Sequence, residues 1–163
     1  MSRSVYVASP EGRTGKSTVA LGLLDALVRE VGSVGVFRPL VNSHTRDSIV
    51  DLLISQPGVE QDHADALGVS YEEAHADPDG AFTRIVEKHG ELAERYDALL
   101  VLGSDYTDVS TPTELAVNAR IASHLGAPVV LTVHGTGRSP ADVVTAAGQA
   151  VAEMAAHHAR VVA

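Results

Sequence analysis

The sequence predicts an α/β domain, a three-layer sandwich around a mostly parallel, doubly wound sheet. Apolar runs of strand length alternate along the chain with longer segments of helical periodicity. One run, residues 98–102, is apolar throughout, as expected of a central strand that is buried on both faces. The length of 163 residues, with 45% hydrophobic and 20% charged residues, predicts one folded domain over residues 1–163.

Short apolar runs mark the expected strands. They cover residues 5–8, 34–37, 98–102 and 129–133. Arg38-Pro39 ends the second run, and we expect the third strand to lie beside the first. Residues 160–163 follow a long helix and resemble the beginning of one more strand of the sheet. We therefore expect the chain to be the N-terminal fragment of a longer, multidomain protein, and not to end in a frayed tail.

Longer segments between these runs carry helical signals. Apolar residues four apart give residues 16–31 one buried face that includes Val19, and Gly32 ends this helix. Further helices are predicted over residues 47–54, from 77 onward, over 113–125, and from the Ser139-Pro140 cap to residue 158. Residues 57–79 are polar, acidic and irregular, which indicates a peripheral insertion of short helical pieces.

Charge and composition exclude several classes of function. The 12 basic and 21 acidic residues give a net charge of −9, which disfavours a nucleic-acid interface and docking to anionic lipid. The chain has no cysteine, so disulfide scaffolds and thiolate metal sites are excluded. No apolar run approaches membrane-spanning length, and the N-terminus does not resemble a signal peptide. We expect a cytoplasmic protein without nucleic-acid or membrane partners.

The residues that carry chemistry are Gly12-x-x-Gly15-Lys16-Ser17-Thr18, between the first strand and the first helix. Glycines let the loop turn its N–H groups inward, and the helix N-terminus adds partial positive charge at the same point. Lys16 can reach the β- and γ-phosphates of a nucleotide, and the Ser17 hydroxyl can hold Mg²⁺. Because the chain contains only one other lysine, a phosphate loop is favoured over a glycine-containing turn without a ligand.

Three segments together resemble the N-terminal domain of long-form phosphate acetyltransferases. They are Ser9–Thr18, Gly35–Pro39 and Gly103–Val109. That domain is itself similar to dethiobiotin synthetase, so the resemblance implies a P-loop NTPase-like fold of the dethiobiotin synthetase type. It also implies that a separate C-terminal domain moves the acetyl group between coenzyme A and phosphate. The present domain would then hold no catalytic residue, and would assist assembly and respond to metabolites.

The resemblance implies partners and binding residues as well. The implied partners are the rest of a phosphate acetyltransferase chain, further copies in a homo-oligomer, and small-molecule effectors. The residues predicted for phosphate or nucleotide binding are Gly12, Thr14, Gly15, Lys16, Ser17, Thr18 and Arg38. Those predicted for metal binding are Ser17, Asp47 and Asp105, with Asp108 of the same loop as the alternative to Asp105. No cofactor is required, but we expect weak binding of MgATP, or a phosphate or sulfate bound in the loop.

Two alternatives remain open. An ATP-dependent enzyme of the dethiobiotin synthetase type is favoured by the intact Lys16-Ser17-Thr18. It is disfavoured because Arg38-Pro39 stands where that family has Lys-Pro, and Leu102 where that family has a glutamate that binds Mg²⁺. A partitioning-type ATPase is disfavoured because Glu11 replaces its characteristic lysine.

Histidines outside the motif are better explained by solvation than by metal ligation. His157 and His158 are adjacent, so they point to different sides of a helix. His44 and His134 lie just past expected strand ends, at the rim where α/β domains bind ligands, but we interpret both as polar loop residues.

Overall fold

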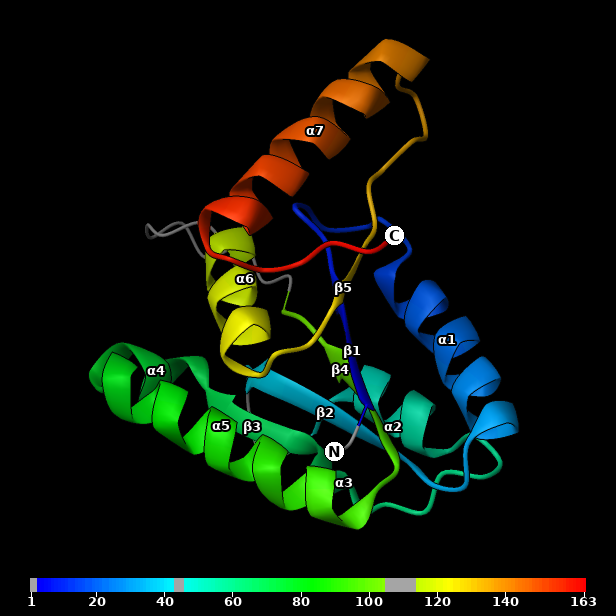
Figure 1. The fold of residues 1–163 in the computed structure, drawn as a ribbon, viewed down its shortest axis with the longest axis vertical. Coiled ribbons are helices and arrows are strands. Elements are labelled where there is room, and N and C mark those ends of the chain that lie inside the picture. The colour runs from blue at the N-terminus through cyan, green and yellow to red at the C-terminus, as the bar shows by residue number, and fades with distance from the viewer. Residues whose placement is uncertain (1–2, 43–45, 105–113) are drawn as a thin grey trace.

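The architecture is a parallel sheet with helices on both faces (Figure 1). The computed structural model describes residues 3–42, 46–104 and 114–163. The five strands are parallel and follow the order β3-β2-β4-β1-β5. They are β1 (Arg3–Ala8), β2 (Val34–Val41), β3 (Leu67–Ser70), β4 (Ala98–Leu102) and β5 (Val129–Leu131). The helices are α1 (Lys16–Glu30), α2 (Ser48–Ile54), α3 (His63–Ala66), α4 (Tyr71–Ala76), α5 (Pro78–Arg95), α6 (Glu114–His124) and α7 (Pro140–Ala156).

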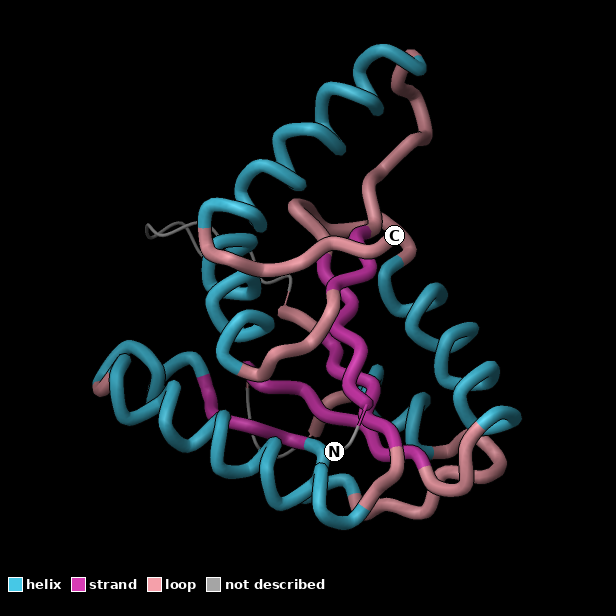
Figure 2. The backbone as a smooth tube through the Cα atoms, viewed as in Figure 1, coloured by secondary structure: helices cyan, strands magenta, loops and turns pink. Residues whose placement is uncertain are grey.

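Alternation along β4 divides the core into two layers. Leu99 and Val101 belong to the cluster that contains residues of α5, α6 and α7. Leu100 and Leu102 belong to the cluster that contains residues of α1 and α2. Successive residues of a strand point to opposite faces of the sheet, so one strand supplies both clusters. Figure 2 shows the resulting helix–sheet–helix arrangement, which confirms the predicted three-layer sandwich.

The central position of β4 is also confirmed. All five of its residues are buried, and it pairs with β1 on one side and β2 on the other. Its register with β1 aligns Val5 with Leu100 and Val7 with Leu102. The carboxyl ends of β1 and β4 therefore emerge side by side, and this edge of the sheet carries the candidate site described below.

The expected end of β2 at Arg38-Pro39 is wrong. The strand continues to Val41, with Arg38 paired to Leu67 of β3 and Leu40 paired to Val69. Its pairing with β4 reaches only Phe37, so the part of β2 that contains Pro39 has one hydrogen-bonded neighbour. A proline without an N–H is tolerated where a strand has an open side.

Residues 57–79 are only partly a set of short helical pieces. They contain α3 and α4, as expected, but also the edge strand β3. Gly68 allows β3 to approach β2 closely, because a Cβ atom at this position would collide with the backbone carbonyl of Pro39. The pattern of apolar residues on either side of a glycine in Leu67-Gly68-Val69 is too short to distinguish a strand from a turn.

The buried face of α1 also differs from the expected one. Ala20 and Leu24 are buried, whereas Val19 is 37% exposed. The face toward the sheet is set by the entry of the helix at Lys16, which is itself buried. The apolar residues spaced four apart from Val19 onward lie at the margin of the contact between α1 and the sheet.

Helix starts agree closely with the sequence signals. Asp47 caps α2 through the amides of Ile49 and Val50, and Asp77 caps α5 through the amide of Gly80. Ser139 forms a capping box at the start of α7. Side-chain oxygens satisfy N–H groups that the first turn of a helix leaves unpaired.

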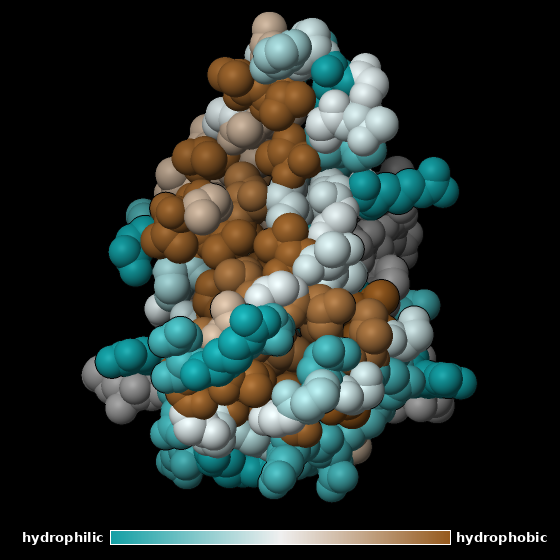
Figure 3. Space-filling view, turned by 90° about the vertical axis from the view of Figure 1, so that its right-hand side faces the viewer, coloured by the Kyte–Doolittle hydropathy of each residue, from teal (hydrophilic) through white to brown (hydrophobic). Residues whose placement is uncertain are grey.

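The last residues pair with the edge strand β5, as predicted. Val161 forms a parallel bridge with Val129, and the amide of Leu131 donates to the carbonyl of Ala163. The preceding helix α7 buries only Ala150 and Met154. Its apolar side chains, with Val144 71% exposed, contribute to the hydrophobic surface in the upper part of Figure 3. In the described part of the chain, no helix is long and apolar enough to cross a membrane.

Candidate phosphate-binding site

The phosphate loop, residues 9–15, joins the carboxyl end of β1 to the first residue of α1. The ends of β4 and β5 lie on either side of it, because β1 is hydrogen-bonded to both strands. The carboxyl edge of a parallel sheet is the usual place for a ligand in this architecture. The sequence-predicted residues Gly12, Thr14, Gly15, Lys16, Ser17 and Thr18 are thus together at one edge.

Two residues of the loop have a left-handed backbone conformation. Gly15 has φ 79°, which is the reason for glycine immediately before α1. Arg13 has φ 59°, which is unfavourable for a residue with a Cβ atom. The Ser9 hydroxyl stabilises the start of the loop, since it donates to the carbonyl of Glu11 at 2.6 Å.

Lys16 is buried, with 3% of its surface exposed. Its ammonium group donates a hydrogen bond to the carbonyl oxygen of Gly103, just past β4, at 2.5 Å. An ammonium group carries three N–H donors, and the Gly103 carbonyl accepts from one of them. The bond connects the phosphate loop to the end of the central strand.

A buried amide holds that end of β4 in place. The Oδ1 atom of Asn118, on α6, accepts from the Tyr6 hydroxyl at 2.7 Å and from the Ser104 amide at 3.0 Å. The Nδ2 atom of Asn118 donates to the carbonyls of Ser104 and Glu114. Burial is the main cause that raises the pKa of Tyr6 well above its ordinary value, so its hydroxyl stays a donor.

Glycine is required at position 103 by this network. A Cβ atom there would lie 2.6 Å from Oδ1 of Asn118 and 2.8 Å from the ring of Tyr6. The carbonyl that receives Lys16 is therefore positioned by buried side chains of β1 and α6. None of these supporting contacts could be inferred from the phosphate-loop motif alone.

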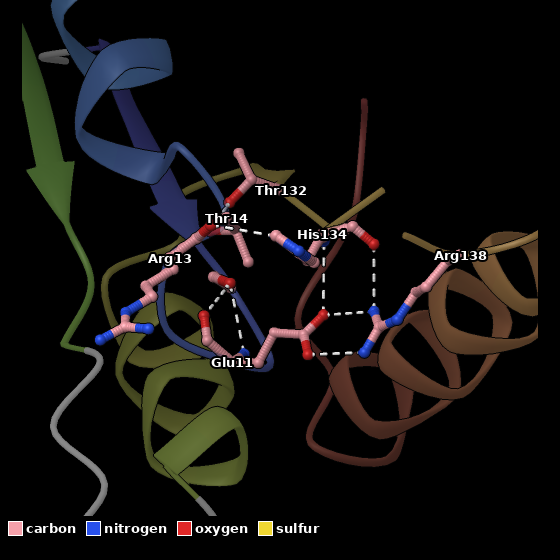
Figure 4. Close-up of polar contacts among 7 residues, drawn as sticks. Glu11, Arg13, Thr14, Thr132, His134 and Arg138 are labelled. Carbon is pink, nitrogen blue, oxygen red and sulfur yellow. Dashed lines mark hydrogen bonds and ion pairs between the residues drawn. The ribbon is translucent and has the colours of Figure 1, made fainter. Parts of the chain in front are cut away.

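The segment after β5 makes polar contacts with the phosphate loop (Figure 4). The hydroxyls of Thr14 and Thr132 lie 3.0 Å apart, and Nδ1 of His134 lies 3.1 Å from the carbonyl of Arg13. Arg138 makes two hydrogen bonds to the carboxylate of Glu11, at 2.5 and 2.8 Å. The hydrogen bond from Arg138 is the main cause that lowers the pKa of Glu11 below its ordinary value.

Arg38 and Asp47 form an ion pair on the other side of β4. Nη1 of Arg38 lies 2.9 Å from Oδ2 of Asp47, and both side chains are almost fully buried. Asp47 also caps α2, so its carboxylate already has a cation and two amides as partners. The binding role of Arg38 and the metal role of Asp47 remain predictions, and each would require a ligand to compete with these contacts.

The remaining metal predictions can be placed only in part. Ser17 lies half-buried in the first turn of α1. Asp105 and Asp108 lie outside the described residues. Leu102, which stands where dethiobiotin synthetases have a carboxylate, is fully buried in the core. The described residues contain no group of three or more His, Cys, Asp or Glu side chains placed to hold a metal.

Sequence reasoning missed the roles of three residues at this edge. Glu11, His134 and Arg138 form one cluster, although more than one hundred and twenty residues separate the first from the others. The position of His134 just past a strand end was the one available signal. Arg138 directly precedes the cap of α7, and nothing in the sequence connects it with Glu11. Together, the residues at this edge can hold an anion through the start of α1 and the ammonium of Lys16.

Comparisons with known proteins agree with the fold and with the predicted resemblance. The chain is 29% identical over 155 residues to a phosphate acetyltransferase of Nitratidesulfovibrio vulgaris, and the match covers 88% of this chain and 22% of that protein. It is 31% identical over 150 residues to a phosphate acetyltransferase of Synechocystis sp., covering 87% of this chain and 22% of that protein. The chain thus spans about a fifth of the length of these curated relatives.

One solved structure and one family model that are similar to this chain indicate the same fold. A BceF tyrosine kinase domain superposes with a TM-score of 0.59 at 17% identity, covering 98% of this chain and 66% of that one. At that identity the match shows a shared fold alone. The family model AAA_26, described as an AAA domain, matches residues 3–163. The chain therefore belongs to the AAA_26 family of AAA domains.

Proposed function

We propose that this chain is a non-catalytic, regulatory and oligomer-forming domain at the N-terminus of a phosphate acetyltransferase. The observation that carries the proposal is the similarity of nearly the whole chain to about a fifth of two phosphate acetyltransferases. In the parent protein, another domain converts acetyl-CoA and phosphate to acetyl phosphate and coenzyme A. The partners of the chain are then that domain, further copies of the same protein, and small-molecule effectors.

The phosphate loop supports a binding role and not a role in phosphoryl transfer. Phosphoryl transfer to or from a nucleotide needs a metal ion bridging the phosphates, held by a hydroxyl and a carboxylate. In this chain Leu102 occupies the position of one metal carboxylate, and Asp47 is engaged by Arg38 and by the amides of α2. The loop and Lys16 are retained, so we propose that the site takes phosphate or sulfate well and MgATP weakly.

The reading frame that contains the chain provides the first experiment. We expect it to encode an acetyltransferase domain, and the protein it encodes to form acetyl phosphate from acetyl-CoA and phosphate. The 163-residue chain alone should show no such turnover. Removal of residues 1–163 should leave the chemistry in place and change the oligomeric state or the response to metabolites. Turnover by the isolated chain would contradict this assignment of roles.

An ATP-dependent enzyme of the dethiobiotin synthetase type is the second candidate. The specific observation in its favour is the intact Lys16-Ser17-Thr18 at the start of α1, with Lys16 held at the edge of the sheet. This candidate requires MgATP to bind tightly and to be hydrolysed in the presence of a carboxylate substrate. Calorimetry with MgATP separates the two candidates directly.

A further inference from the structure

We infer that the segment from Thr132 to Arg138 sets the charge and the shape of the phosphate loop, and that Arg138 is a positioning residue for anion binding. The inference rests on the proposed anion-binding function and deepens it. It concerns Glu11, the one acidic residue of the loop, whose carboxylate would oppose a bound phosphate if it carried an uncompensated charge.

Arg138 compensates that charge by direct contact. Its two Nη atoms lie 2.5 and 2.8 Å from the two carboxylate oxygens of Glu11. The His134 amide donates to the same carboxylate at 3.3 Å. A paired guanidinium and carboxylate fix orientation as well as charge. In Figure 4 the Glu11 side chain extends toward Arg138, while the Arg13 side chain points the other way.

The same segment also stabilises the unfavourable backbone of the loop. Arg13 has φ 59°, and its carbonyl lies 3.1 Å from Nδ1 of His134. The next residue, Thr14, is joined to Thr132 through their hydroxyls. Contacts at Glu11, Arg13 and Thr14 therefore come from one short segment, which holds the loop in its anion-binding shape before any ligand arrives.

If Glu11 and Arg138 set the charge of the loop, their single variants should change the affinity for phosphate in opposite directions. The loss of a merely structural contact would weaken binding in both variants. Glu11→Gln leaves the cation of Arg138 and should tighten binding of inorganic phosphate, whereas Arg138→Gln leaves the anion of Glu11 and should weaken it. At low ionic strength we expect each change to be about two- to fivefold, and to shrink as salt is added. Glu11→Gln with Arg138→Gln removes both charges and should bring the dissociation constant closer to the wild-type value than Arg138→Gln alone, and Arg138→Lys should recover most of it.

Calorimetry with inorganic phosphate is the measurement, and the ion pair of Asp25 with Arg29 is the matched control. That pair is exposed on α1, so Asp25→Asn and Arg29→Gln make the same charge changes away from the loop and should leave the affinity unchanged. If both loop variants weaken binding alike, or if neither changes it, the inference is wrong. If the wild-type chain does not bind phosphate at all, the proposed function is what fails.

Limited proteolysis supplies a second test that needs no ligand. Trypsin cleaves after Arg13, which is exposed in the loop. Glu11→Gln and Arg138→Gln should both accelerate release of the peptide 1–13, measured by mass spectrometry under conditions where circular dichroism shows a folded chain. The control variants on α1 should be cleaved at Arg13 at the wild-type rate. An unchanged rate in both loop variants would overturn the claim that this contact holds the loop.

Discussion

Lys16 and Gly103 connect the phosphate loop to the central strand through a 2.5 Å hydrogen bond from the ammonium group to the carbonyl. The carbonyl gives the ammonium group of Lys16, a residue that is 3% exposed, the acceptor that a buried charged donor needs. The bond also makes the position of the lysine depend on residues that lie far from the motif. The Gly103 carbonyl is fixed by the contacts of Asn118 with its neighbour Ser104.

Asn118→Ala should destabilise the fold by about 2–4 kcal/mol, because it removes one amide that satisfies several buried groups. Tyr6→Phe removes a single member of the network and should destabilise it by about 1 kcal/mol. Urea denaturation measures both effects. The matched control is Tyr96→Phe, whose hydroxyl donates to Glu60 at an exposed position and whose loss should matter little. If Asn118→Ala were no more harmful than this control, the network would not support the site.

Arg13→Gly should be more stable than Arg13→Ala by about 1 kcal/mol, because glycine adopts the left-handed conformation without a steric penalty. Both variants remove the same side chain, so their difference isolates the backbone at φ 59°. His158, with φ 62°, provides a parallel pair of variants away from the loop. Thermal unfolding measures the difference. An alanine variant at least as stable as the glycine variant would show that Arg13 is not held in this conformation in solution.

Gly68→Ala should destabilise the fold by about 3 kcal/mol or more, because its Cβ atom would displace the backbone of β2 at Pro39. Gly148→Ala, in α7, is the control. It meets no atom within 4 Å, and alanine there should stabilise the helix by up to about 1 kcal/mol. Opposite signs in chemical denaturation are the expected outcome. A neutral Gly68→Ala would argue against the pairing of β3 with β2.

The ion pair of Glu11 with Arg138 should make the folded state less stable as the pH falls. The folded state lowers the pKa of Glu11 below its ordinary value of 4.5, chiefly through the hydrogen bond from Arg138. Its contribution is therefore present above that ordinary value and is lost as the pH falls through the lowered one. The stability difference between wild type and Glu11→Gln should be largest near neutral pH and vanish in acid.

The size of this effect is limited by solvent. The two side chains are about one-third exposed, at 32% and 33%, so solvent screening keeps the contribution of this ion pair to stability small. Denaturation curves at a series of pH values measure it. A difference between the two proteins that grows on acidification would contradict the assigned ion pair.

The sequence was sufficient for the parts of the fold that local patterns specify. The apolar run of β4 predicted its central place, and the Ser139-Pro140 cap predicted the start of α7. The strand β3 was missed because four residues carry too little periodicity, and its pairing depends on the close approach of Gly68 to Pro39. Such contacts arise only when the chain has folded.

The candidate site likewise combines a local sequence motif with contacts between residues that lie far apart in the sequence. The glycines and Lys16 of the loop form a local motif at the start of α1, and their role in anion binding stays a prediction. The partners of that motif come from α6 and from the segment before α7, with no spacing that connects them in the sequence. Arg138 is the clearest case, since its role depends on the parallel pairing of β5 with β1.

Calorimetry with MgATP and with inorganic phosphate tests the central claim most directly. The account predicts that phosphate binds, that Lys16→Ala abolishes this binding while circular dichroism shows a folded chain, and that MgATP binds only weakly. We expect weak binding of MgATP because Leu102 provides no metal ligand and Asp47 is engaged by Arg38. A dissociation constant for MgATP on the order of micromolar, about −8 kcal/mol, that Lys16→Ala abolishes would contradict the account and favour a working ATP-dependent enzyme.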